Sequence, residues 1–293
     1  MKGRSILEVV LVFAGLMILA RWRYAVMAGW GASEMVQMYV SGLLMLLIPL
    51  VIIALVARRN YAAYGLTLKD WKYNVDVGLT CYPVRMISWI GGFGLITLLR
   101  TSYLQPIGAL ILLITCLIEI VVILLIFRRH DQTGRVERTS QTSPLGNLIV
   151  LVALILFPII LGTFLGKLTL DVVSTVFWQV VFSGFGEELF YRGYIQSRVN
   201  QEFGRPWQVM SVSFGPGLIV ASLLFGLSHA LNTYNPSMGQ YDLSWWWAVW
   251  TVVGGVFFGL VREKAGSIVA PGLAHGVLDA VGEGSAVLFG WQL

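Results

Sequence analysis

PIGALILLITCLIEIVVILLIF, residues 106–127, is an apolar run of 22 residues that holds a single charged side chain, Glu119. A helix of about 20 apolar residues is long enough to cross the hydrocarbon core of a bilayer, which is roughly 30 Å thick. This stretch therefore predicts a transmembrane helix.

Similar apolar runs recur along the chain and are separated by short polar connections. They lie near 5–20, 35–57, 76–99, 146–166, 170–190, 216–232, 244–261 and 266–290. Two runs are interrupted, because Pro83 and Arg85 break the one at 76–99 and glutamates close the one at 170–190. We therefore predict an all-α fold, a polytopic transmembrane helical bundle of about eight or nine spans.

The composition of the whole chain also indicates a membrane protein. Hydrophobic residues make up 57% of the sequence, charged residues 12%, and the mean hydropathy is +0.78. A soluble domain carries about twice that share of charge. Membrane lipid is therefore the first expected partner.

Basic residues predict the orientation, because they accumulate on the cytoplasmic side of a membrane. With the N-terminus inside, 15 of the 20 Lys and Arg residues fall on inner segments and 4 on outer ones. We expect a plasma-membrane protein with a cytoplasmic N-terminus and an external C-terminus. Cytoplasmic loops facing anionic lipid explain the net charge of +5, so nucleic acid is not an expected partner.

Two aromatic or basic clusters are expected at the membrane interface. Arg21-Trp22-Arg23 follows the first run, which we interpret as a retained helix rather than a cleaved signal peptide. Trp245-Trp246-Trp247 begins the eighth run and is typical of an interfacial aromatic belt.

The chain divides into two halves around one polar stretch, which runs from Arg128 to Ser143. We predict N-terminal transmembrane helices over 1–130, a cytoplasmic linker over 131–145, and a catalytic helical domain over 146–293. Cys81 and Cys116 both lie in apolar runs and are expected to be core residues.

Helix-spaced polar groups inside the apolar runs of the second half are the candidate functional site. They are Glu187 and Glu188 with Arg192, Phe225 with His229, and His275 with Asp279. A spacing of four residues places Glu188 beside Arg192 and His275 beside Asp279 on single helix faces. Ionisable groups are expensive in a bilayer, so they indicate function. Carboxylates and imidazoles activate water and stabilise an oxyanion, which predicts an intramembrane peptidase with a catalytic cavity.

Three ordered motifs extend this prediction, namely GEELFYRG at 186–193, FGLSH at 225–229 and GGVFFGLVREKAGSIVAPGLAHGVLD at 254–279. Together they resemble the CPBP (Abi) intramembrane proteases, which include the type II CAAX prenyl endopeptidases and bacteriocin-processing or immunity proteins. The resemblance implies that Glu187 activates water with His229, and that His275 and Asp279 stabilise the oxyanion. It implies a membrane-associated substrate, which is a prenylated CAAX-like C-terminus, a leader peptide or a small membrane protein.

The last motif departs from the prenyl-processing pattern, which tends to have asparagine where this chain has Asp279. An amide donates a hydrogen bond, whereas an ionised carboxylate only accepts. Asp279 is therefore expected either to be protonated or to orient His275.

Structural and metal-binding interpretations of the same residues stay open. Glu188 and Arg192 are expected to form a supporting ion pair, which leaves Glu187 as the free carboxylate. We favour a mechanism without metal or other cofactor. Zinc remains an alternative, and its ligands would be Glu187, His229, His275 and Asp279.

Two other functional classes also stay open. One is a proton-coupled transporter, against which the lack of an inverted repeat counts. The other is a non-catalytic membrane scaffold or immunity protein, which would tolerate Glu187→Gln.

Depth along the helices yields two further expectations. Straight helices would hold Glu187 and His229 at opposite faces, so tilted, kinked or shorter helices are expected around a cavity. Gly215-Pro216-Gly217 and Pro271-Gly272 are the candidate helix breaks. Arg85 and Glu119 lie at a matched depth of roughly 12–13 Å on consecutive antiparallel helices. We predict that they form a buried ion pair.

Overall fold

The computed structural model describes residues 3–56, 60–132 and 143–290, and almost all of them are helical. The helices of the first half are α1 (Arg4–Gly29), α2 (Glu34–Val56), η1 (Tyr61–Tyr64), α3 (Trp71–Met86), the π-helical η2 (Ile87–Gly92), α4 (Phe93–Leu98) and α5 (Pro106–Gln132).

The second half is helical with two small hairpins. Its longer helical segments are α6 (Pro144–Phe164), α7 (Leu170–Trp178), the π-helical η3 (Gln179–Glu187) and η4 (Leu189–Gln196), α8 (Ser197–Phe203), α9 (Pro216–Ala230), α10 (Trp245–Ala265) and α11 (Val269–Phe289). The short segments are β1 (Trp207–Val209), β2 (Val212–Phe214), η5 (Leu231–Thr233), β3 (Tyr234–Asn235), η6 (Pro236–Met238) and β4 (Gln240–Tyr241).

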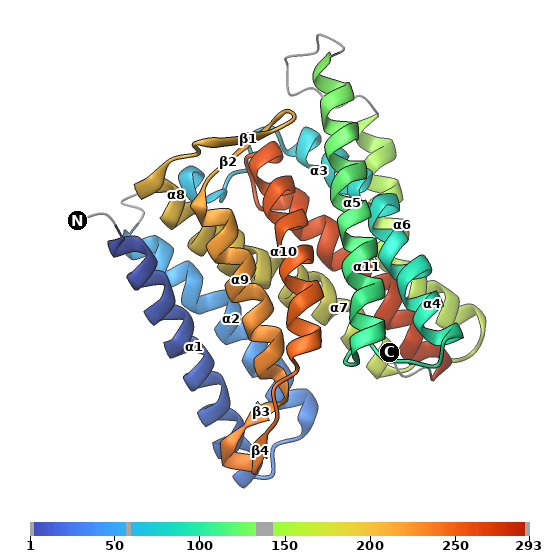
Figure 1. Cartoon of the computed structure of the whole chain (residues 1–293). Helices are drawn as coiled ribbons and strands as arrows, with labels where there is room; N and C mark the ends of the chain where they lie inside the picture. The colour runs from blue at the N-terminus through green and yellow to red at the C-terminus, as the bar shows by residue number, and fades with distance from the viewer. Residues whose placement is uncertain (1–2, 57–59, 133–142, 291–293) are drawn as a thin grey trace.

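The long helices form one bundle, with the two antiparallel hairpins at its opposite ends (Figure 1). Helix α10 packs against α9 and α5, and α11 packs against η3, α3, α7 and α6. One core cluster joins α1, α2, η4 and α9, and another joins α3, α5, α10 and α11. The two halves of the chain therefore pack into each other.

Helix boundaries follow the sequence locally. Pro144 and Pro216 begin α6 and α9, where a missing N–H costs no hydrogen bond. Gly266 ends α10 with a φ of 77°, a left-handed conformation that glycine adopts without strain.

The predicted all-α bundle is confirmed, and every predicted run coincides with helix. Among the described residues, six helices are long and apolar enough to cross a membrane: α1, α2, α5, α6, α9 extended to Thr233, and α10. The runs at 76–99, 170–190 and 266–290 are helical but fall outside that set. The total of eight or nine spans stays a prediction.

The predicted Arg85–Glu119 ion pair is present between α3 and α5. Both side chains are buried, and the second oxygen of Glu119 accepts the Ser88 backbone N–H at 2.9 Å. Cys81 and Cys116 are buried and free, as expected. Most of the predicted linker, residues 133–142, lies outside the described residues, so the division into domains stays a prediction.

The expected helix breaks were wrong in position. Pro216 and Pro271 both lie in the first turn of their helices, where proline continues a helix without bending it. The irregular backbone instead lies in η3 and η4, where π-helical turns replace α-helical ones within one continuous helix from α7 to α8. Such turns are rare and occur mostly at functional sites.

Candidate active site

The bundle encloses a cavity of about 770 Å³. Its walls come from α1, α2, η3, η4, α9, α10 and α11, together with the segment from α3 to α4. Glu187, His229, His275 and Asp279 all line this cavity, although they come from three separate helical segments. The four predicted site residues thus share one cavity, and their catalytic roles stay a prediction.

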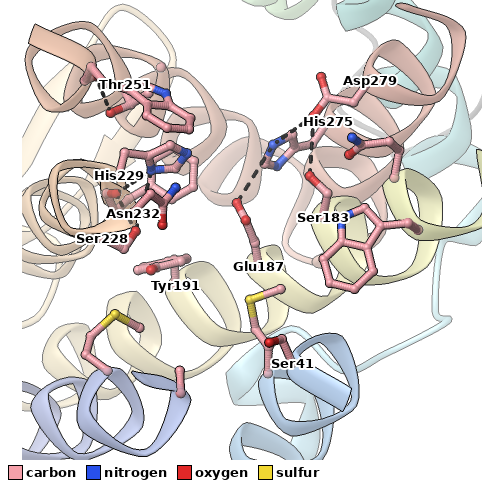
Figure 2. A pocket seen from close by; sticks show the side chains of 18 of the residues that line it. Ser41, Ser183, Glu187, Tyr191, Ser228, His229, Asn232, Thr251, His275 and Asp279 are labelled. Atoms are coloured by element: carbon pink, nitrogen blue, oxygen red, sulfur yellow. Dashed lines mark hydrogen bonds and ion pairs between the residues drawn. The ribbon is translucent and has the colours of Figure 1, made fainter. Parts of the chain in front are cut away.

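Three of the predicted residues form a compact group. His275 Nε2 lies 3.4 Å from Asp279 Oδ2 and 3.9 Å from Glu187 Oε2. Ser183 donates its hydroxyl hydrogen to Asp279 Oδ2 at 3.4 Å. Figure 2 shows Glu187 pointing toward the imidazole, with Asp279 and Ser183 beyond it. Asp279 faces the imidazole, which agrees with the expectation that it orients His275.

The other nitrogen of His275 is held by Glu188. Its Nδ1 lies 3.0 Å from Glu188 Oε1, and Arg192 Nη1 donates to the same oxygen at 2.8 Å. A carboxylate paired with Arg192 only accepts, so His275 Nδ1 carries the hydrogen. The expected Glu188–Arg192 ion pair is confirmed, and both of its side chains are fully buried.

Aromatic rings enclose these charged groups. Phe258 stacks on the His275 ring with centroids 4.5 Å apart and planes 18° apart. The Arg192 guanidinium lies 4.6 Å from the centroid of Phe225 and 5.3 Å from that of Phe258. Phe225 therefore packs directly against Arg192.

His229 lies on a different wall. Its Nδ1 is 2.8 Å from the carbonyl oxygen of Phe225, which is an acceptor, so Nδ1 donates and Nε2 keeps its lone pair. Among the described residues, no hydrogen bond or ion pair joins His229 to Glu187. Figure 2 shows His229 and Tyr191 on one side of Glu187 and His275 on the other. Glu187 therefore contacts His275 directly, and the water that it is expected to share with His229 stays a prediction.

Close packing of glycines brings the two helices of the site together. A Cβ atom on Gly184 would lie 2.6 Å from the Cα of Gly276, a distance that real side chains do not reach. The π-helical segment η3 therefore lies directly on α11, and Glu187 is positioned beside His275.

Comparison with known proteins finds one family match. Residues 169–281 match the family described as Type II CAAX prenyl endopeptidase Rce1-like. This segment is an Rce1-like domain. The expected resemblance is thus confirmed, and all four predicted site residues lie inside the matched range. No curated protein and no solved structure matches the chain.

The Rce1-like domain and the six apolar helices establish the general class. The chain is an integral membrane protein with a domain of the CAAX protease family. The plasma membrane and the predicted orientation remain predictions.

Sequence reasoning missed several residues that line the cavity. They are Gln179, Ser183, Tyr191, Asn232, Trp247 and Glu283. Four-residue spacing was an available signal for three of them, because Ser183 and Tyr191 flank Glu187 and Glu283 follows Asp279 at that interval.

Both predicted interfacial clusters contribute residues to the cavity, and their position at the membrane interface stays a prediction. Helix α1 continues to Gly29, so Arg21 and Arg23 lie within it and line the cavity. Arg21 donates to the carbonyl oxygen of Leu231 at 2.6 Å, and Arg23 donates to that of Gln37 at 2.7 Å. Trp247 also lines the cavity, 5.2 Å from the His229 ring, whereas Trp245 and Trp246 are exposed.

The four candidate zinc ligands line one cavity, but they do not lie together in one cluster. Within the described part of the chain, no three His, Cys, Asp or Glu side chains are arranged to hold a metal ion. His229 in particular is separated from the His275 group, which consists of Glu187, His275 and Asp279. Metal dependence stays a prediction for experiment.

Proposed function

We propose that this protein is an intramembrane endopeptidase that hydrolyses a peptide bond of a membrane-associated substrate with water activated by Glu187. The observation that carries the proposal is the joint placement of Glu187, His275, Asp279 and His229 around one cavity. The Rce1-like match supports the protease class.

The chemistry begins with a water molecule between Glu187 and His229. Glu187 takes its proton, while the Nε2 lone pair of His229 accepts the second hydrogen and orients the oxygen. The resulting hydroxide attacks the carbonyl carbon of the scissile bond.

Negative charge then develops on the carbonyl oxygen. Because Nδ1 already carries a hydrogen, His275 acts here as an imidazolium, and its Nε2–H beside Asp279 donates a hydrogen bond to this oxyanion and stabilises the tetrahedral intermediate. Glu188 fixes the ring from the other side. The C–N bond breaks, and the proton held by Glu187 passes to the leaving amine.

Mass spectrometry of lipid-anchored peptides tests this function. A farnesylated C-terminal peptide and an acylated leader peptide are incubated with the detergent-purified protein in water enriched in ¹⁸O. We expect two products from one of them, with a single ¹⁸O in the new carboxylate. Glu187→Gln should abolish the products, and Asp171→Asn, at an exposed residue of α7, is the matched control. Equal cleavage by Glu187→Gln would contradict the proposal.

A further inference from the structure

The cavity extends past the His275 group into an aromatic region that the proposed mechanism does not use. Trp89, Phe93, Tyr103, Trp247 and Trp250 line it. Phe93 lies 5.6 Å from Trp89, 6.2 Å from Tyr103 and 6.3 Å from Trp250 between ring centroids, and Tyr103 lies 5.3 Å from Trp247. Three of the five precede the Rce1-like domain, so this region is built jointly by both halves of the chain.

Glu283 supplies a carboxylate to this region. It follows Asp279 by four residues on α11, lines the cavity and is only partly exposed. A Cβ atom on the preceding Gly282 would lie 2.0 Å from the Trp89 ring, so that ring rests directly on α11 beside Glu283. Burial, and after it the charge of Glu283, raise the pKa of the Tyr103 phenol in the connection from α4 to α5. Glu283 therefore lines the same cavity as Trp89 and Tyr103, and it follows directly in sequence the glycine on which Trp89 packs.

The cations that line the cavity are engaged elsewhere. Arg85 pairs with Glu119, and Arg21 and Arg23 donate to backbone carbonyl oxygens. Within the described residues, Glu283 has no hydrogen-bond or ion-pair partner. The aromatic region thus holds a carboxylate for which this part of the chain provides no counter-ion.

A carboxylate beside aromatic rings is suited to a cation. Ring faces attract ammonium and guanidinium groups, and an acid at membrane depth is most stable beside an opposite charge. We propose that Glu283, Trp89, Phe93, Tyr103 and Trp250 form a subsite, the Glu283 subsite, that binds a lysine or arginine side chain of the substrate. This proposal rests on the proposed peptidase function and names a substrate feature for it.

The helix sets the distance from this subsite to the scissile bond. Eight residues separate His275 from Glu283 on α11, which corresponds to about 12 Å along the axis. An extended peptide advances roughly 3.3–3.6 Å per residue. The basic residue is therefore expected about three or four residues from the cleaved bond.

A charge-swap experiment tests the subsite with a cleavable lipid-anchored peptide. Lysine is placed in turn at positions two to five residues from the cleaved bond and compared with the uncharged norleucine. We expect the ratio of kcat/KM values, lysine over norleucine, to reach roughly tenfold at one position. Glu283→Gln should bring that ratio to about one, and Glu283→Lys should make the peptide with glutamate at that position the preferred substrate.

Two further variants control for misfolding in this experiment. Trp250→Leu should lower the ratio through loss of a ring face while the carboxylate stays, and Asp171→Asn should leave it unchanged. A ratio near one in the wild type, or an undiminished ratio in a folded Glu283→Gln variant, would overturn the subsite.

Direct binding separates this proposal from the peptidase function. In a neutral detergent, dodecylammonium should raise the Tm of the wild type more than dodecanol does, and Glu283→Gln should lose the difference. That result supports the subsite even where no peptide is cleaved, whereas equal effects of the two probes would overturn it. Tighter binding of dodecyltrimethylammonium would assign the site to choline headgroups and overturn the assignment to a peptide side chain.

Discussion

His275 is restrained at both ring nitrogens and on one face of the ring. Glu188 contacts Nδ1, Asp279 lies opposite Nε2, and Phe258 covers one face. A histidine held in this way keeps its protonation state and its orientation while charge develops in front of it. Glu188 is therefore a positioning residue, although its ion pair with Arg192 is structural.

Substitution of the groups in the cavity should separate these roles. Glu187→Gln, His229→Ala and His275→Ala should each lower kcat by a factor of at least about a hundred, because general-base and oxyanion contributions are each of that size. Their Tm values should stay near that of the wild type. Kinetics on a cleavable lipid-anchored peptide, with Asp171→Asn as the control, provide the measurement.

Glu188→Gln should behave differently from Glu187→Gln. It removes the partner of a fully buried arginine, and breaking such a pair costs about 3–5 kcal/mol. We expect both Tm and kcat to fall, as measured by thermal unfolding and by peptide cleavage. A variant with wild-type Tm would show that Arg192 finds another partner.

Metal removal tests the preferred mechanism without any substitution. Prolonged chelation should leave the cleavage rate unchanged, and elemental analysis should find no stoichiometric zinc in the purified protein. Loss of activity that zinc alone restores would reverse the preference for a metal-independent mechanism.

At the scale of elements, the contact between η3 and α11 decides the geometry of the site. Gly184 and Gly276 meet at their backbones, and Glu187 and His275 each lie within one helical turn of that contact. Small residues allow helices in membranes to approach closely in this way. The π-helical turns and the glycine contact thus position the carboxylate and the imidazole together.

Gly184→Ala should therefore reduce activity without touching any polar group. The added methyl would push η3 away from α11, and a displacement of about 1 Å at a reacting group costs roughly a hundredfold in rate. Gly15→Ala is the matched control, since nothing lies within 4 Å of its Cβ position on α1. An unchanged kcat in a folded Gly184→Ala protein would show that the contact does not position the site.

At the scale of the whole molecule, the Arg85–Glu119 pair connects the first half to the site. The Arg85 guanidinium lies 5.1 Å from the ring centroid of Phe258, the same ring that stacks on His275. Arg85 also lines the cavity. A residue outside the Rce1-like domain therefore supports the wall on which the imidazole rests.

Glu119→Gln should destabilise the bundle strongly. It leaves Arg85 charged, buried and unpaired, at a cost of about 3–5 kcal/mol. The double variant Arg85→Met with Glu119→Gln should recover a large part of the lost stability, because it removes the isolated charge. Thermal unfolding in detergent measures both, and equal Tm values for the single variant and the wild type would contradict the prediction.

Features that depend on local order along the chain were predictable from the sequence. The apolar runs determined the helices, since hydropathy acts within each segment. Four-residue spacing determined the Glu188–Arg192 pair because both residues lie on one helix. Matched depth on consecutive helices was enough to predict the Arg85–Glu119 pair across one short connection.

Only the tertiary structure decided how the helix faces meet. That Glu187 contacts His275 and not His229 depends on how closely Gly184 approaches Gly276, and residue spacing within one helix carries no information about the distance to another. The position of the π-helical turns likewise reflects packing. The prolines expected to break helices lie instead in first turns, where proline does not bend a helix. Trp89, Tyr103 and Glu283 are separated by up to 194 positions, so their meeting follows only from packing both halves around one cavity.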